Sequence, residues 1–326
     1  MNRRNALLAL LATGAAPLPA IAQTARRVRR IGFLSAGGAQ ADGAFLAAFR
    51  AGMLELGWAD GRDYIIDMRD VKGVMPALPG TADELVASNP DLLLGVANGS
   101  SLMFAQRTKT IPIVFAVAQD PVANGLAASL RMPGGNATGL SSMIAELWGK
   151  RLQLLKEAFP RVAHVALLFA PADAGAISQV KEIEAAAPRL GLRVSPFELR
   201  QPADIEPAFK RAVASGVGAC VVTVDAFTNN HRQVIADHLQ RLKMPAMFAA
   251  SHYVEPGGLM SYGASFTDNF RRAAAYVDKI FKGAKPGELP IEQPTKFELT
   301  VNMKTAKAIG IKFPESFMLS VTRVID

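Results

Sequence analysis

The sequence contains little of what metal and redox chemistry require. Its 326 residues include one cysteine, Cys220, and four histidines. A single cysteine can form no internal disulfide and no CxxC pair, and no two histidines have the HExxH spacing that places two zinc ligands on one helix face. These absences exclude a disulfide scaffold, and they predict a protein that holds no metal ion and no other cofactor.

Motifs of the common catalytic machineries are missing as well. There is no GxSxG nucleophile turn, no GxxxxGK[ST] phosphate loop and no GxGxxG between a strand and a helix. The acidic residues form no spaced pair of the kind that glycosidases use. The sequence therefore predicts a protein that is not an enzyme. An exported hydrolase or isomerase stays an alternative, because catalytic triads assemble from distant residues.

The basic balance of the chain does not indicate a nucleic-acid partner. Lysine and arginine number 36 against 28 aspartate and glutamate, and four of the arginines cluster between residues 26 and 30. No aromatic residues alternate with them, and no helix-turn-helix pattern precedes the first predicted strand. We interpret residues 23–29 as a flexible, solvated basic arm.

The first 22 residues have the pattern of an export signal. Arg3 and Arg4 precede a run from Ala6 to Ala22 that has no charge and ends in Ala20-Ile21-Ala22. Two prolines break this run, which is too short to span a bilayer, since that takes roughly 20 apolar residues. We predict cleavage after Ala22 and a mature protein in the periplasm. The pattern does not decide between the general and the twin-arginine export routes.

Strand and helix patterns alternate along the rest of the chain. Apolar runs such as RIGFLS (30–35) and DLLLGVA (91–97) are typical of parallel strands that are buried on both faces, and Phe45, Phe49 and Met53 follow at helical spacing. The expected strands are 30–35, 64–68, 91–97, 113–117, 162–169, 192–197, 218–224 and 244–249. Two β–α series of similar length predict an α/β protein with two doubly wound lobes, each built on a parallel sheet. The stretch after residue 259 is too small for a separate core and should complete the two lobes.

Four motifs resemble one protein family. They are AQDPV (118–122), PGGNATGLSS (133–142), GGLMSYG (257–263) and LPIEQPTKFELTVNMKTAKAIG (289–310). In this order they resemble the substrate-binding proteins of ABC transporters, and more closely the tryptophan- and tyrosine-type branch, over essentially the whole mature chain. The resemblance implies a type I periplasmic-binding (Venus-flytrap) fold, in which two lobes joined by three crossover strands close on a ligand. It also implies two partners, a membrane permease and its ATPase.

The resemblance also suggests where the lobes divide. The crossovers should lie near residues 138–141, near Tyr262 and in the proline-rich passage before Phe297. We therefore expect residues 30–138 and 263–288 to form lobe one, and residues 139–262 and 289–326 to form lobe two. We also expect a monomer that touches the membrane only through its permease.

Ligand-binding residues are predicted from the fold. In doubly wound folds, ligands lie at the carboxyl ends of the strands, where loops lead into helix N-termini. The exposed N–H groups and the helix dipole there favour an anionic group such as a carboxylate. The candidates in these loops and at the hinge are Ser35, Asn98, Gly99, Ser100, Ser101, Gln119 and Asp120 in lobe one, and Asp225, Phe227, Ser251 and Tyr262 in lobe two.

Several candidates have a purely structural interpretation beside the functional one. Asn98 is a good helix N-cap whatever binds nearby, and Asp120 stands before a proline that favours the first position of a helix. Asp225 either meets a ligand ammonium group or only caps the residues after it. Phe227 either stacks on an aromatic ligand or fills the core. His252 is interpreted as a rim residue.

The predicted function is that of an exported substrate-binding protein of an ABC importer, which captures a small carboxylate in the interlobe cleft by hinge closure. A hydrophobic or aromatic amino acid is the first choice of ligand. The loop GVANGSS (95–101) lacks the Thr-Pro pair that is usual in the aromatic amino-acid binders, and APAD (170–173) replaces an Asn-Pro pattern. Another aromatic or branched carboxylate is therefore an alternative ligand. A sensor for a membrane kinase or chemoreceptor is an alternative function.

Overall fold

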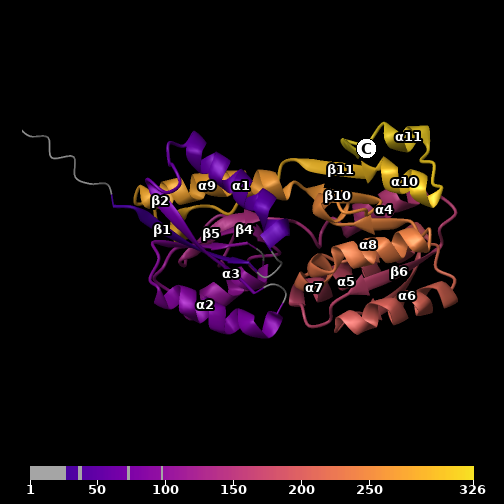
Figure 1. Ribbon diagram of the computed structural model, residues 1–326, viewed down its shortest axis with the longest axis horizontal. Helices are drawn as coiled ribbons and strands as arrows, with labels where there is room; N and C mark the ends of the chain where they lie inside the picture. The colour runs from indigo at the N-terminus through magenta and orange to yellow at the C-terminus, as the bar shows by residue number, and fades with distance from the viewer. Residues whose placement is uncertain (1–26, 36–38, 72–73, 97) are drawn as a thin grey trace, which may run out of the picture.

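The protein consists of two α/β lobes that lie side by side (Figure 1). The computed structural model describes residues 27–35, 39–71, 74–96 and 98–326. The predicted export signal, residues 1–22, lies outside the described residues. Within the described ranges, no helix is both long enough and apolar enough to cross a membrane.

The first lobe is built on a parallel sheet of five strands in the order β2-β1-β3-β4-β5. The strands are β1 (Arg29–Ser35), β2 (Tyr64–Asp70), β3 (Leu92–Gly95), β4 (Ile113–Ala118) and β5 (Ala137–Ser141). Helices α2 (Leu78–Ala87) and α3 (Asn98–Arg107) pack together, and α1 (Ala39–Glu55) packs on α9 (Phe266–Phe281). In Figure 1 these two pairs of helices lie above and below the sheet.

The continuous apolar runs of these strands result from burial on both faces. Along β3, Leu92 and Leu94 belong to the apolar cluster that includes Phe45 and Phe270 of helices α1 and α9, whereas Leu93 belongs to the cluster of helices α2 and α3. Because successive side chains of a strand point to opposite faces, a strand between two helical layers needs apolar residues at every position. This explains why DLLLGVA could be assigned from the sequence.

The predicted basic arm is not free at its end. Arg29 is the first residue of β1, and its guanidinium donates a hydrogen bond to Asp91 at 3.1 Å. Arg27 pairs with the same carboxylate at 3.2 Å. The segment expected to be flexible through residue 29 therefore overlaps β1 at Arg29, and the sequence offered no sign that Asp91 would lie beside these arginines.

The second lobe is built on a sheet of seven strands in the order β12-β11-β10-β9-β8-β6-β7, in which only the β10–β11 pair is antiparallel. Helices pack on this sheet and on one another, among them α4 against α5 and α6 against α8. The strands are β6 (His164–Phe169), β7 (Arg193–Glu198), β8 (Ala219–Val222), β9 (Ala246–Phe248), β10 (Met260–Ala264), β11 (Phe297–Asn302) and β12 (Arg323–Ile325). The helices are α4 (Trp148–Ala158), α5 (Ala174–Ala186), α6 (Ile205–Ala214), α7 (Ala226–Asn230), α8 (Arg232–Arg241), α10 (Met303–Ile309) and α11 (Glu315–Met318).

The chain passes between the lobes three times. It leaves the first sheet after β5, returns from β10 directly into α9, and passes back through residues 289–296 into β11. The first and third passages touch each other, because the Ser141 N–H donates to the carbonyl of Glu292 at 2.9 Å. The boundary expected between residues 138 and 139 falls inside β5, and that expected between residues 262 and 263 falls inside β10.

Two motif glycines allow close backbone approaches beside these passages. Gly139 of β5 has φ = 146°, and a Cβ atom there would lie 2.0 Å from the carbonyl oxygen of Phe115 in β4. At Gly263 in β10, a Cβ would lie 2.2 Å from the carbonyl oxygen of Ala249. Neither position has room for a side chain. This gives a physical reason for Gly139 in PGGNATGLSS and for Gly263 in GGLMSYG.

Candidate functional site

A pocket lies between the two lobes, at the carboxyl ends of strands from both sheets. On the first lobe it is lined by Asn98–Ser100 at the start of α3 and by Gln119 just after β4. On the second lobe it is lined by Asp173 before α5, and by Asp225 and Asn229 around α7. This is the edge at which doubly wound folds bind ligands, because loops and helix N-termini from several strands meet there.

One end of the pocket is acidic. Asp225 is buried, and its carboxylate caps α7 by accepting from the Thr228 N–H at 2.8 Å, while the Thr223 hydroxyl donates to its other oxygen at 2.8 Å. Burial, together with the nearby carboxylate of Asp173, raises the pKa of Asp225 to about 6. Burial also raises the pKa of Asp173, which caps α5 by accepting from the Ala176 N–H at 3.0 Å. A cationic group here would favour the ionised form of both carboxyls.

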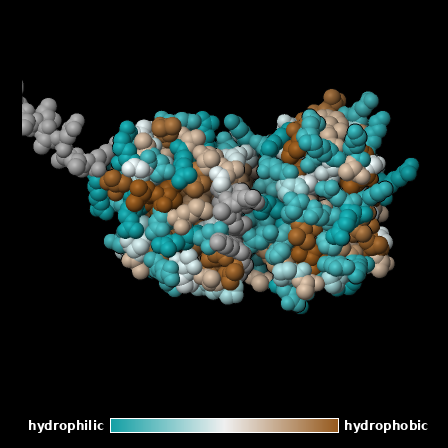
Figure 2. All heavy atoms as spheres, viewed as in Figure 1, coloured by the Kyte–Doolittle hydropathy of each residue, from teal (hydrophilic) through white to brown (hydrophobic). Residues whose placement is uncertain are grey.

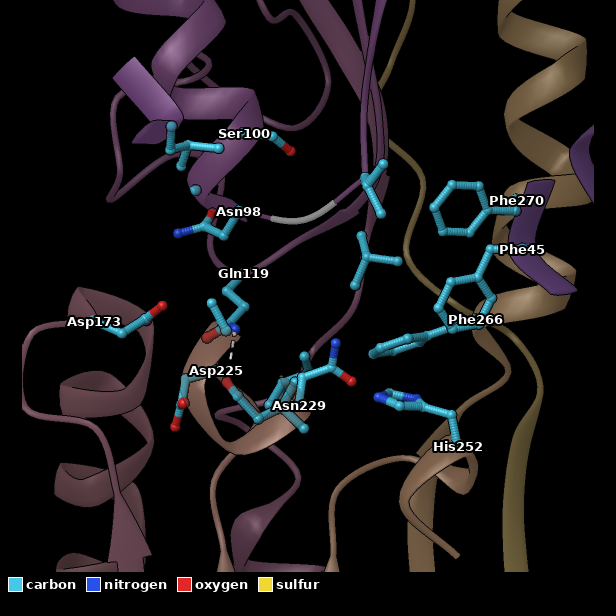
Figure 3. A pocket seen from close by; sticks show the side chains of 17 residues that line it. Phe45, Asn98, Ser100, Gln119, Asp173, Asp225, Asn229, His252, Phe266 and Phe270 are labelled. Carbon is cyan, nitrogen blue, oxygen red and sulfur yellow. Dashed lines mark hydrogen bonds between the residues drawn. The ribbon is translucent and has the colours of Figure 1, made fainter. Parts of the chain in front are cut away.

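The other end is aromatic. Phe45 of α1 stacks on Phe270 of α9 with ring centroids 5.1 Å apart, and Phe266 at the start of α9 completes the wall. His252 meets Phe45 edge to face at 5.7 Å. Burial, and then the charge of Arg232, lower the pKa of His252 to about 3, so its ring is neutral near pH 7. Figure 3 shows these four rings on one side of the pocket, with Asn98, Asp173 and Asp225 on the other.

A hydrogen-bond network crosses between the lobes beside the pocket. Gln119 of lobe one accepts from the Gln179 amide at 3.4 Å, and it donates to the carbonyl oxygen of Val224 at 3.5 Å. Gln179 lies in α5 of lobe two, where it is fully buried between Trp148 and Val224. The lobes therefore touch through polar groups beside the pocket.

The space-filling view agrees with this arrangement. In Figure 2 the two lobes lie against each other, and hydrophilic residues border the visible seam on the side of the second lobe. Large apolar residues such as Leu54 and Leu319 are exposed, but away from the pocket. The apolar part of the site is thus the buried aromatic wall rather than the outer surface.

Five of the eleven candidate residues line the pocket: Asn98, Gly99, Ser100, Gln119 and Asp225. Asn98 also accepts a hydrogen bond from the Asn124 amide at 3.4 Å. For Asp225, both expected roles are compatible with the geometry, because it caps α7 and faces the pocket.

Three candidates of lobe one lie outside the pocket lining. Ser35 is buried at the end of β1. The Ser101 hydroxyl packs over β3, where a Cβ at Gly95 would lie 2.1 Å from it. Asp120 is exposed and has φ = 37°, and its carboxylate accepts from the Ala123 N–H at 3.0 Å, which caps the following turn. The contacts of Asp120 therefore agree with its structural interpretation as a capping residue.

Three candidates of lobe two also lie outside it. Phe227 stacks on His231 with centroids 4.3 Å apart and packs against the core. Ser251 lines a neighbouring cavity on the far side of His252. Tyr262 stacks on Phe297 at 6.1 Å, in line with a place at the hinge, but does not line the pocket. The sequence placed these loops correctly at the carboxyl ends of the strands. The direction of each side chain was not predictable from the loop alone.

Other lining residues were not among the candidates. Phe45, Phe266 and Phe270 lie on helices and are almost fully buried, so their spacing indicates a core face, and they do contribute to the core as well. Asn229 lies one helical turn after Asp225, and Asp173 is the last residue of APAD. A signal for the aromatic wall did exist in the capped start of α9, since Ser265 caps the helix that Phe266 begins.

Comparison with known proteins assigns the chain to a family. Residues 41–325 match the ABC transporter substrate-binding protein family, so this chain belongs to that family of solute-binding proteins. The family confirms the resemblance seen in the four motifs. The α/β fold with two parallel-sheet lobes, as predicted, is that of type I periplasmic binding proteins.

Three relatives set the degree of similarity. A tyrosine-binding protein of Clostridioides difficile is 23% identical over 256 residues, which cover 78% of this chain and 73% of the relative. A conserved domain protein of Vibrio cholerae has a crystal structure with a TM-score of 0.84 and 26% identity, covering 91% of this chain and 100% of that one. An ABC domain of Streptococcus pneumoniae in complex with L-Trp has a TM-score of 0.83 and 26% identity, with the same coverage of 91% and 100%.

Proposed function

We propose that this protein is the exported binding subunit of an ABC importer and that it captures an aromatic amino acid in the cleft between its lobes. The observation that carries the proposal is the division of the pocket into an aromatic end and an acidic end. An aromatic amino acid has the matching parts, an apolar ring and an ammonium group, together with a carboxylate that the N-terminus of α3 can accept.

Each part of the ligand has an assigned partner. The ring lies against Phe45, Phe266 and Phe270. The ammonium group lies near Asp225 and Asp173, whose pKa values are raised by burial, so that a cation here would stabilise their ionised forms. The carboxylate lies at residues 98–100, at the N-terminus of α3, where the helix dipole favours an anionic group. The relatives from Clostridioides difficile and Streptococcus pneumoniae, described as tyrosine-binding and as bound to L-Trp, support this class of ligand.

The importer function requires partners outside the cleft. We propose that residues 1–22 direct export to the periplasm with cleavage after Ala22, and that the monomeric closed form delivers the ligand to a membrane permease driven by its ATPase. The division into lobes of residues 30–138 with 263–288, and 139–262 with 289–326, is part of this proposal, with the boundaries adjusted to the ends of β5 and β10.

A thermal-shift screen tests the ligand class. The chain is purified, unfolded and refolded to remove any carried-over ligand, and then mixed with aromatic and branched amino acids, indole-3-acetate, tryptamine, sugars and nucleosides. A ligand at 100 times its Kd adds about 2.7 kcal/mol to the free energy of unfolding, a clear rise in midpoint. We expect a rise with tryptophan or tyrosine, and little with indole-3-acetate or tryptamine, which lack one charged group. A rise with a sugar or nucleoside alone would reject the proposal.

A further inference from the structure

One side-chain oxygen in the pocket wall has no hydrogen-bond partner among the described residues. Asn229 is the penultimate residue of the short helix α7 and lines the pocket, and its side-chain oxygen Oδ1 is buried without a hydrogen bond to any group in the described part of the chain. Its backbone is paired, because the N–H donates to the carbonyl of Asp225 at 3.0 Å and the carbonyl accepts from Arg232 at 2.8 Å. The unpaired acceptor is therefore confined to the side chain.

The groups around Asn229 make this oxygen exceptional. Both carboxylate oxygens of Asp225 accept hydrogen bonds, and the Thr228 hydroxyl bonds to the carbonyl oxygen of Thr223 at 2.8 Å and to the Tyr253 hydroxyl at 3.0 Å. A buried acceptor without a donor loses its hydration and gains nothing in return, so native proteins keep few of them. An orphaned acceptor in a pocket wall indicates that the ligand supplies the donor.

The position of the amide indicates which part of the ligand that donor belongs to. In Figure 3 the Asn229 amide extends away from Asp225 and toward Phe266 and His252, at the aromatic end of the pocket. A ring lying along this wall would present its edge to Oδ1. The edge of an indole carries an N–H and the edge of a phenol an O–H, whereas a phenyl ring carries no hydrogen-bond donor.

We propose that Asn229 is a specificity-determining residue, whose Oδ1 accepts a hydrogen bond from an N–H or O–H on the ring of an aromatic amino acid. The inference rests on the proposed function, because it presumes that the ring lies at the aromatic wall. A site that pairs with a donor rejects the analogue that lacks it, since the buried acceptor is then left unpaired. The pocket should therefore distinguish tryptophan or tyrosine from ring analogues without the donor.

Paired ligands test this proposal by isothermal titration calorimetry on the refolded chain. One pair is L-tryptophan and β-(3-benzothienyl)-L-alanine, in which sulfur replaces the indole N–H. The other is L-tyrosine and L-phenylalanine. We expect the donor-bearing member of at least one pair to bind about tenfold more tightly. Asn229→Leu should bring that ratio close to one by weakening only the donor-bearing ligand.

Asn230→Leu is the matched control, because Asn230 is the neighbouring residue of α7 and does not line the pocket. It should keep the wild-type ratio. Equal affinities within both pairs for the wild type would overturn the role of Asn229 while leaving the proposed function intact. A fall for all four ligands alike in Asn229→Leu would overturn it too, since that pattern indicates a contact with the ammonium group or a structural role. If no aromatic amino acid binds, the proposed function and this inference both fail.

Discussion

At the scale of single residues, Asp225 combines a structural role with a place in the pocket wall. It caps α7 through the Thr228 N–H and also faces the pocket. Burial raises its pKa from the ordinary 3.8 to about 6. The folded protein therefore holds this proton more tightly than the unfolded chain, and unfolding releases it between about pH 4 and 6. It follows that this carboxyl costs stability as the pH rises through that range.

The pH dependence of ligand binding follows from the same carboxyl. An ammonium group binds the ionised form of Asp225, so the affinity for an amino acid should fall as the pH drops below about 6. Asp225→Asn, which keeps a capping oxygen, should bind weakly and without this dependence. The measurement is Kd by calorimetry between pH 5 and 7.5, and wild-type affinity that is flat over this range would contradict the prediction.

The ligand-free protein provides an independent check on Asp225. As the pH rises from 4.5 to 7, the thermal midpoint of the wild type should fall relative to that of Asp225→Asn. The reason is that only the wild type has a carboxyl at position 225, which loses its proton in this range. A difference that does not change with pH would show that the folded-state pKa of this carboxyl is not raised.

At the scale of elements, Arg151 of α4 holds two of the interlobe passages together. Its fully buried guanidinium donates to the carbonyl of Tyr262 in β10 at 2.7 Å and to that of Ile144 in the passage after β5. It also stacks on Trp148 at 4.8 Å and has no carboxylate partner in the described part of the chain. Burial lowers its pKa to about 9. Such an arrangement fixes the chain on both sides of the hinge.

Removing this guanidinium should destabilise the protein. Arg151→Met keeps much of the apolar stem but leaves buried carbonyls unpaired, and we expect a loss of about 2–4 kcal/mol in the free energy of unfolding, since each such carbonyl costs about 1–3 kcal/mol and the buried charge is removed. Urea unfolding measures this loss. Lys150→Met, at an exposed neighbouring position, is the control and should change stability by less than about 0.5 kcal/mol. Equal stability of the two variants would disprove the role of Arg151.

Some helices and strands could be predicted from the sequence, and others could not. Strands β3, β4 and β6 were predicted to within a few residues, because burial on both faces makes their apolar runs continuous. The short helix α7 lies directly before α8, and the two are separated at His231. The cap by Asp225 starts α7, and a cap of this kind depends on a side-chain direction that spacing does not report.

The site was predictable to a similar degree. The loops at the carboxyl ends of the strands follow from the topology, so Asn98, Gln119 and Asp225 were found. The aromatic wall was not, because Phe45 and Phe270 have the spacing of an ordinary core face. Their exposure to the pocket depends on α9 returning from the second lobe to lie on α1, which is a long-range contact.

At the scale of the whole molecule, closure depends on the contacts that cross between the lobes. Gln119 bonds to Gln179 and Val224 across the cleft, although both hydrogen bonds are long. A ligand selects the closed form by binding it more tightly than the open form, and groups that already favour closure reduce what the ligand must supply. We therefore expect the Gln119 amide to contribute to affinity through the position of the lobes.

Loss of this amide should shift the ligand-free protein toward the open form. We expect Gln119→Ala to raise the radius of gyration measured by small-angle X-ray scattering without ligand and to raise Kd by about three- to tenfold. Gln153→Ala, which removes an exposed amide on α4, should change neither. If Gln119 acts only as a direct ligand contact, Kd will rise while the ligand-free radius stays the same.

Because α9 packs on the first lobe but comes late in the chain, the first lobe cannot be completed until most of the protein has been synthesised. The last strand of the first sheet ends at Ser141, but the helix that covers Phe45 and Phe49 ends at Phe281. At about 5–20 residues per second, a ribosome needs roughly 7–28 s to make the segment between them. Throughout this interval the nascent first lobe exposes an apolar face, on which a chaperone can hold the chain unfolded.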